Sequence, residues 1–169
     1  MSKRKPQTMQ LYSIVDELMA SPVNPLHKNQ RDHHLGIITK SFHALEKGEH
    51  PTLQDVGHVA DAVNMLDTIV NMRFNQTAKD FDEIEFLDET RRASTDAVAR
   101  CAIRGRETGT YRFDAPGLVV VRELIEFYSD LLDVLPARVF IKAHRKTTTD
   151  VADALAGRLK SKDIQVVEV

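Results

Sequence analysis

The chain has little of what many active sites are built from. Its 169 residues include no tryptophan, one cysteine and seven glycines. Cys101 has no partner for an internal disulfide, and its place beside Ala102 in a helical pattern predicts a buried thiol. The sequence has no Gly-rich phosphate loop, no G-x-S-x-G and no Cys-x-x-Cys. We therefore expect no enzyme activity and no cofactor.

Long apolar runs are also missing. No run approaches the roughly 20 apolar residues that a membrane helix needs, and no apolar core follows Lys3-Arg4-Lys5, as a secretory leader would require. A single cysteine is typical of a reducing compartment, so we expect a cytoplasmic protein without membrane contact. The net charge of -2 argues against a surface devoted wholly to nucleic acid, although it leaves room for a local basic patch.

Helical spacing dominates what is present. Between Arg31 and Lys47 apolar residues recur at three-and-four spacing, with Asn29 as a candidate cap and Gly48 as the terminator. Thr52 to Asp55 resembles a capping box, and the short connection before it predicts an antiparallel helix pair. The sequence predicts an all-α, single-domain antiparallel bundle of about five to seven helices. We expect it to span residues 8–160, between a basic arm at 1–7 and a β-like tail at 161–169.

Turn and cap residues divide the second half of the chain. Gly105 and Gly109 bracket a predicted turn, and Asp114 caps the helix that follows. A short basic helix is predicted from Ala137 to His144, and Thr147 to Asp150 caps another from Val151 to Leu159. This pair loosely suggests a helix-turn-helix.

The helix predicted between Asp80 and Arg106 is acidic in its first half and basic in its second, which complements the helix dipole. Arg91 and Ser94 occupy positions where apolar residues are expected. Their presence predicts an exposed middle or a kink, and a seam between two copies of the chain is a further option. The acidic half is the candidate protein-binding patch, with Asp82, Glu83, Glu85, Asp88 and Glu89 as its members.

A basic set offers a different kind of surface. Arg138, Lys142 and Arg145 share a helix face, because they are spaced i, i+4 and i+7. With Lys146 and the arm residues Lys3, Arg4 and Lys5, they form the candidate nucleic-acid contact.

Seven histidines invite a metal hypothesis, but their spacing does not support it. The nearest approach to a helical metal motif is His58 with Asp61, and the adjacent His33 and His34 point about 100° apart on a helix. We expect solvated or partly buried histidines and no metal site. Ser41 with His43 does not form a nucleophile pair, since residues two apart on a helix face different directions.

Part of the sequence resembles a known group of proteins. The resemblance lies in the block Lys40-Ser41-Phe42-His43-Ala44-Leu45 and in Gly48, Thr52, Asp55 and Asn64-Met65-Leu66 after it. This part resembles a group of short, mostly uncharacterised helical proteins of proteobacterial phages and plasmids, some of them loosely labelled DNA-binding regulators. The opening Ser2-Lys3-Arg4-Lys5, the Asn24-Pro25 step and Thr108 to Phe113 are also similar. The resemblance implies a mobile-element setting and supplies no functional residues, and the chain departs from the group after about Lys146.

These patterns favour binding over catalysis. We expect a non-enzymatic accessory protein of a phage or mobile element that binds another macromolecule, foremost a host or phage protein, with a homodimer as an option. The alternatives are a small DNA-binding regulator that uses the basic face and, second, an enzyme with an unrecognised metal site.

Overall fold

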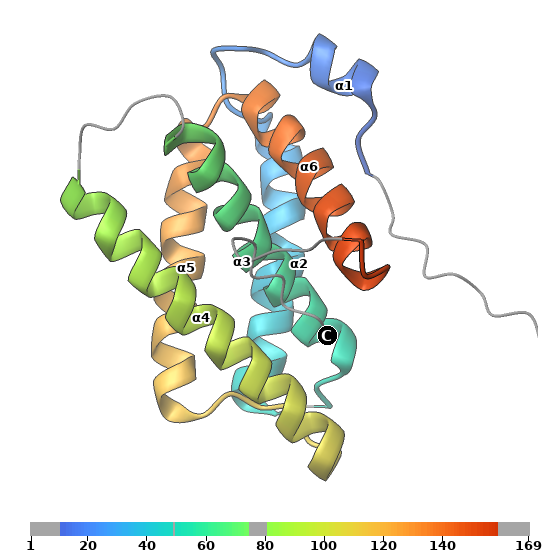
Figure 1. Ribbon diagram of the computed structural model, residues 1–169, viewed down its shortest axis with the longest axis vertical. Coiled ribbons are helices and arrows are strands. Elements are labelled where there is room, and N and C mark those ends of the chain that lie inside the picture. Colours follow the sequence, from blue (N-terminus) through green and yellow to red (C-terminus); the bar gives the residue numbers. More distant parts are fainter. Residues whose placement is uncertain (1–10, 49, 75–80, 159–169) are drawn as a thin grey trace, which may run out of the picture.

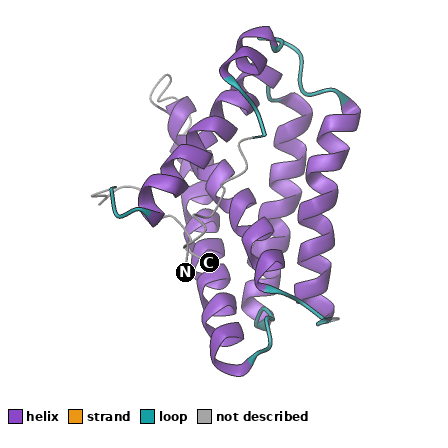
Figure 2. Cartoon of the chain, turned by 90° about the vertical axis from the view of Figure 1, so that its right-hand side faces the viewer, coloured by secondary structure: helices purple, strands orange, loops and turns teal. Residues whose placement is uncertain are grey.

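The computed structural model describes residues 11–48, 50–74 and 81–158, with side chains described at 11–48, 50–72 and 88–158. In these ranges the chain forms helices and no strand (Figure 2). The helices are α1 (Ile14–Met19), α2 (Lys28–Lys47), α3 (Leu53–Phe74), α4 (Phe81–Thr108), α5 (Ala115–Val134) and α6 (Ala137–Leu155). The prediction of an all-α bundle is confirmed. The predicted basic arm at 1–7 and the tail at 161–169 lie outside the described residues.

The helix ends follow local chemistry. Gly48 terminates α2 with a φ of +73°, and its N–H donates to the Ala44 carbonyl at 2.8 Å. The Thr52 N–H donates to the Asp55 carboxylate at 2.8 Å, which confirms the predicted capping box at the start of α3. The Asp114 carboxylate accepts from the Gly117 N–H at 2.8 Å and caps α5, also as predicted.

α3 is the central helix of the bundle. It packs against α2, α4, α5 and α6, and Figure 1 shows it in the middle of the molecule. Val56, Val59 and Leu66 line its core side and are almost fully buried, as are Tyr128 of α5 and Phe140 of α6. Each such side chain contributes about 1.5–3 kcal/mol by leaving water. Asn64, Asp67 and Thr68 of α3 are polar residues that are also buried.

The predicted break between two C-terminal helices is wrong, because α6 runs without interruption from Ala137 to Leu155. The threonines expected to cap a new helix bond back along the existing one. Thr148 Oγ1 donates to the His144 carbonyl at 2.9 Å and Thr149 Oγ1 to the Arg145 carbonyl at 3.0 Å. The helix-turn-helix suggestion is lost with the break.

Two boundary predictions are also corrected. α4 continues through Gly105 to Thr108. A Cβ on Gly105 would lie 1.9 Å from the Tyr111 ring, so this glycine allows packing and makes no turn. The N-cap of α2 is His27, whose Nδ1 accepts from the Asn29 N–H, so Asn29 lies inside the helix.

Candidate functional site

The predicted acidic patch is only partly within the described side chains. The side chains of Asp82, Glu83 and Glu85 lie outside them. Asp88 forms ion pairs with Arg91 and with Arg92, whereas Glu89 is exposed. The described end of the patch is therefore partly neutralised by the basic residues that follow it.

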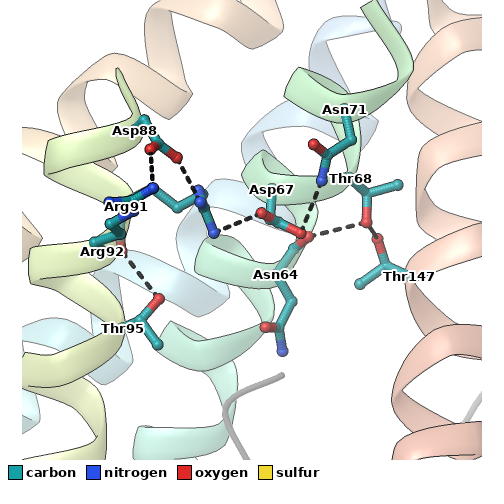
Figure 3. A network of polar contacts seen from close by, with 9 residues as sticks. All are labelled: Asn64, Asp67, Thr68, Asn71, Asp88, Arg91, Arg92, Thr95 and Thr147. Carbon is teal, nitrogen blue, oxygen red and sulfur yellow. Dashed lines mark hydrogen bonds and ion pairs between the residues drawn. The ribbon is translucent and has the colours of Figure 1, made fainter. Parts of the chain in front are cut away.

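The interruption of the α4 stripe has an internal explanation. Arg91 Nη1 meets the Asp67 carboxylate of α3 at 2.7 Å, and both side chains are largely buried (Figure 3). Ser94 is fully buried, and its hydroxyl donates to the Val120 carbonyl at 3.3 Å. The prediction of an exposed or kinked middle is wrong, because these polar residues join α4 to α3 and α5.

Most of the predicted basic face is engaged within the chain. Arg138 donates to the Leu18 and Ala20 carbonyls at 3.1 and 3.2 Å. Arg145 pairs with Glu17 of α1, and Lys146 pairs with Asp150 at 2.7 Å. Lys142 is exposed and has no ion pair within the described residues, and Lys3, Arg4 and Lys5 lie outside them. Two of the cations proposed to contact DNA thus hold α1 against α6.

α1 itself exposes an apolar face. Ile14, Val15, Leu18 and Met19 are between 58% and 81% exposed, although they make up most of this short helix. Figure 1 shows α1 beside one end of α6, apart from the other helices. Besides the arginine contacts, Tyr12 packs edge-on against Phe140, with ring centroids 6.0 Å apart. The helix is anchored by its polar atoms, and its apolar side chains point to solvent.

A pocket of about 360 Å³ opens between α2, α3 and α6. Its residues recur at helical spacing on each of the three helices, a signal that is present in the sequence, although the sequence alone does not show which helices are neighbours. Apolar and polar side chains line it together: Leu11, His34, Ile37, Ile38, His58, Asp61, Met65, His144, Thr147, Thr148 and Val151.

The imidazoles at this pocket differ in their hydrogen bonding. His34 Nε2 is 2.9 Å from the Tyr128 hydroxyl, and His58 Nδ1 is 2.8 Å from the Ser41 hydroxyl. Burial, together with smaller effects of His144 and His33, lowers the pKa of His34 to about 4. Burial also lowers the pKa of His144, whose buried Nδ1 has no hydrogen-bond partner in the described chain. His34 and His144 are therefore neutral at pH 7.

Asp61 is the carboxylate of the pocket. It has no hydrogen bond or ion pair among the described residues, and its side chain is open to solvent. Burial nevertheless raises its pKa to about 6, against a smaller lowering by His58. Solvent access and a raised pKa are compatible here, because Asp61 lines a pocket in which protein atoms replace much of the water around its carboxylate.

The residues considered for nucleophilic chemistry are unsuited to it. Ser41 pairs with His58 and not with His43, but its side chain is buried with only 3% exposure, so a substrate cannot reach the hydroxyl. Cys101 is buried, as predicted, and desolvation raises the pKa of its thiol to about 11. Neither side chain offers an accessible nucleophile.

In the part of the chain that the structure describes, no group of three histidine, cysteine or acidic side chains is placed to hold a metal ion. Nor is any described helix both long and apolar enough to cross a membrane. Comparisons with protein families, curated proteins and solved structures give no match to this chain.

Proposed function

We propose that this protein is a non-enzymatic binding protein whose partner is another protein, and that α1 is its docking element. The observation that carries the proposal is the exposed stripe Ile14, Val15, Leu18 and Met19. These positions follow the i, i+1, i+4, i+5 spacing of an amphipathic helix that binds an apolar groove. Apolar side chains that are exposed together on one face mark an interaction site more often than single exposed apolar residues do.

The anchoring of α1 supports the same proposal. A helix of this length is not stable alone in water, because nucleation is unfavourable. Arg138 bonds the carbonyls at its C-terminal end, and Arg145 pairs with Glu17. The helix is thus ordered before a partner arrives, which reduces the conformational entropy lost on binding.

The proposed partner is a host or phage protein with an apolar groove that accepts one face of a helix. The setting in a phage or mobile element is supported by the sequence resemblance alone. The DNA-binding alternative is not favoured by any observation here, since Arg138 and Arg145 would have to leave α1 to contact phosphates.

Affinity capture with matched variants tests the proposal. The full chain is used as bait against a lysate of the organism that carries the gene, beside a Val15→Glu, Met19→Glu variant. The control is Val119→Glu, Val134→Glu, which alters exposed apolar residues of α5. We expect one stoichiometric protein that is retained by the control and lost by the α1 variant, and that binds the purified wild-type chain at least about tenfold more tightly than the variant.

Two results would redirect or overturn this assignment. Capture that survives the α1 variant but is lost with Glu83→Lys, Glu85→Lys would place the interface on the acidic patch. Light scattering that shows a dimer of the wild-type chain, converted to monomer by the α1 variant, would make the partner a second copy.

A further inference from the structure

The pocket between α2, α3 and α6 has the size and composition of a small-molecule site. Its volume of about 360 Å³ lies within the range of known ligand pockets, roughly 300–1,000 Å³. Ile37, Ile38, Met65 and Val151 supply an apolar wall from three helices. A ligand here would need an apolar body.

The polar groups of the pocket differ in whether the fold already uses them. Thr147 Oγ1 donates to Thr68 Oγ1 at 2.7 Å, and Thr148 donates to the His144 carbonyl. The Ser41 hydroxyl is hydrogen-bonded to His58 Nδ1, and the Tyr128 hydroxyl is hydrogen-bonded to His34 Nε2. Two groups remain: His144 Nδ1, which is buried without a partner, and the carboxylate of Asp61, to which no described side chain or backbone N–H donates. The fold gives this carboxylate no internal role.

The electrostatics of the pocket select the charge of a ligand. His34 and His144 are neutral at pH 7, because burial lowers the pKa of each. The pKa of Asp61 is about 6, so its carboxylate is mostly ionised at that pH. The pocket therefore presents one negative charge beside hydrogen-bond acceptors and an apolar wall. This charge would repel an anionic ligand. A cationic ligand would pair with the Asp61 carboxylate and offset the cost of its partial desolvation.

We propose that this pocket binds a small primary amine with an apolar body, whose ammonium group pairs with Asp61 while its hydrocarbon part lies against Ile37, Met65 and Val151. The ammonium has three N–H donors, which suits a site that offers acceptors. This site is separate from α1 and does not depend on the proposed protein partner.

Three probes of similar shape and different charge test the selectivity. Isothermal titration of the full chain at pH 7.5 compares 2-phenylethylamine, 2-phenylethanol and phenylacetate. We expect the amine to bind at least about tenfold more tightly than the alcohol, as one charge-assisted hydrogen bond provides, and phenylacetate not to bind. Amide NMR shifts caused by the amine should centre on Ile37, Asp61 and Val151.

Two variants assign the effect to residues. Asp61→Asn should abolish the preference for the amine over the alcohol, whereas the control Asp130→Asn, at an exposed position of α5, should keep it. Val151→Trp should fill the pocket and prevent binding of all probes, with Val119→Trp as its control. Circular dichroism checks that each variant keeps its helices.

The pH dependence adds an independent readout. Affinity for the amine should fall below about pH 6 as Asp61 takes up a proton. His34, His58, His144 and Tyr128 are the other titratable groups around it, and the alcohol probe reports their effect without the charge. No amine binding at millimolar concentration, equal binding of all three probes, or an unchanged amine preference in Asp61→Asn would overturn the proposal.

Discussion

Asp67 and Asp61 both lie on α3, but their carboxylates have different surroundings. Asp67 is buried, meets Arg91 at 2.7 Å and accepts from Asn71 Nδ2 at 3.2 Å (Figure 3). Asp61 opens into the pocket with no partner among the described residues. Burial raises the pKa of both, and for Asp67 it outweighs the opposing effect of Arg91.

The difference separates a structural role from a functional one. The Asp67 carboxylate is accounted for by the packing of α3 against α4, because removing its partner would leave a buried charge. The Asp61 carboxylate has a desolvation penalty that the smaller effect of His58 does not offset, and strongly perturbed carboxylates of this kind cluster at functional sites. The two carboxylates and their surroundings should therefore respond differently to substitution and to pH.

The largest effect is expected from Arg91→Met. It leaves Asp67 without its main partner and should lower the free energy of unfolding by about 3 kcal/mol. Urea denaturation measures it, with Arg92→Met as the control, since Arg92 is mostly exposed and should change stability by less than about 0.5 kcal/mol. Adding Asp67→Leu to Arg91→Met should restore most of the loss. Equal effects of the two arginine variants would mean that the Asp67 pair is not a structural contact.

A second effect comes from His34 on the pocket side. Its pKa is about 4 in the folded chain against 6.5 for the free side chain, so the unfolded state binds more protons between these values. The contribution of His34 to stability should therefore fall by about 2 kcal/mol as the pH drops from 6.5 to 4. Asp61 acts in the opposite direction between its ordinary pKa of 3.8 and about 6, because its pKa in the folded chain is raised.

Comparison of variants isolates the histidine. His34→Gln should lose less stability than wild type over this range, whereas His33→Gln, at an exposed neighbouring position, should follow wild type. Chemical denaturation at a series of pH values measures the difference. Superimposable wild-type and His34→Gln curves would show that His34 is not held neutral by the fold.

Much of the fold was predictable because it is encoded locally. The spacing of Leu35, Ile38 and Phe42, the turn at Gly48 and the cap at Asp114 each depend on a few neighbouring residues. The break in α6 was predicted wrongly because threonine caps a helix start or bonds to the preceding turn, and burial of Thr147 against Thr68 selects the second.

The pocket and the Asp67 pair were not predictable in the same way. In the sequence, Arg91 interrupts an apolar stripe, and its partner Asp67 lies on another helix, α3. The sequence does not show which helices are neighbours. His58 and Asp61 were recognised as a spaced pair, but His34 and His144 join them only through the packing of α2 and α6 against α3. The histidines were expected to be solvated or partly buried, and His34 and His144 are partly buried.

The smallest effect is expected at α1, where polar contacts hold a helix that contributes little to the core. Arg138→Gln with Arg145→Gln should change the global free energy of unfolding by less than about 1 kcal/mol, as is usual for exposed or half-buried pairs. Amide exchange in α1 should nevertheless accelerate severalfold, because the helix opens locally. Hydrogen exchange read by mass spectrometry checks both. Unchanged exchange in α1 would show that the arginines do not anchor it.

The contrast between the two aspartates is tested most directly by unfolding Asp61→Asn and Asp67→Asn side by side at pH 7.5. Asp61→Asn should be stabilising by on the order of 1 kcal/mol, since it removes an uncompensated carboxylate that retains solvent access, and the gain should vanish near pH 4. Asp67→Asn should be destabilising by about 2 kcal/mol, because the cost of leaving the largely buried Arg91 guanidinium without this carboxylate outweighs the relief of the desolvation that raises the pKa of Asp67. Opposite signs support the division between a structural and a ligand-binding carboxylate, whereas destabilisation by both variants would contradict it.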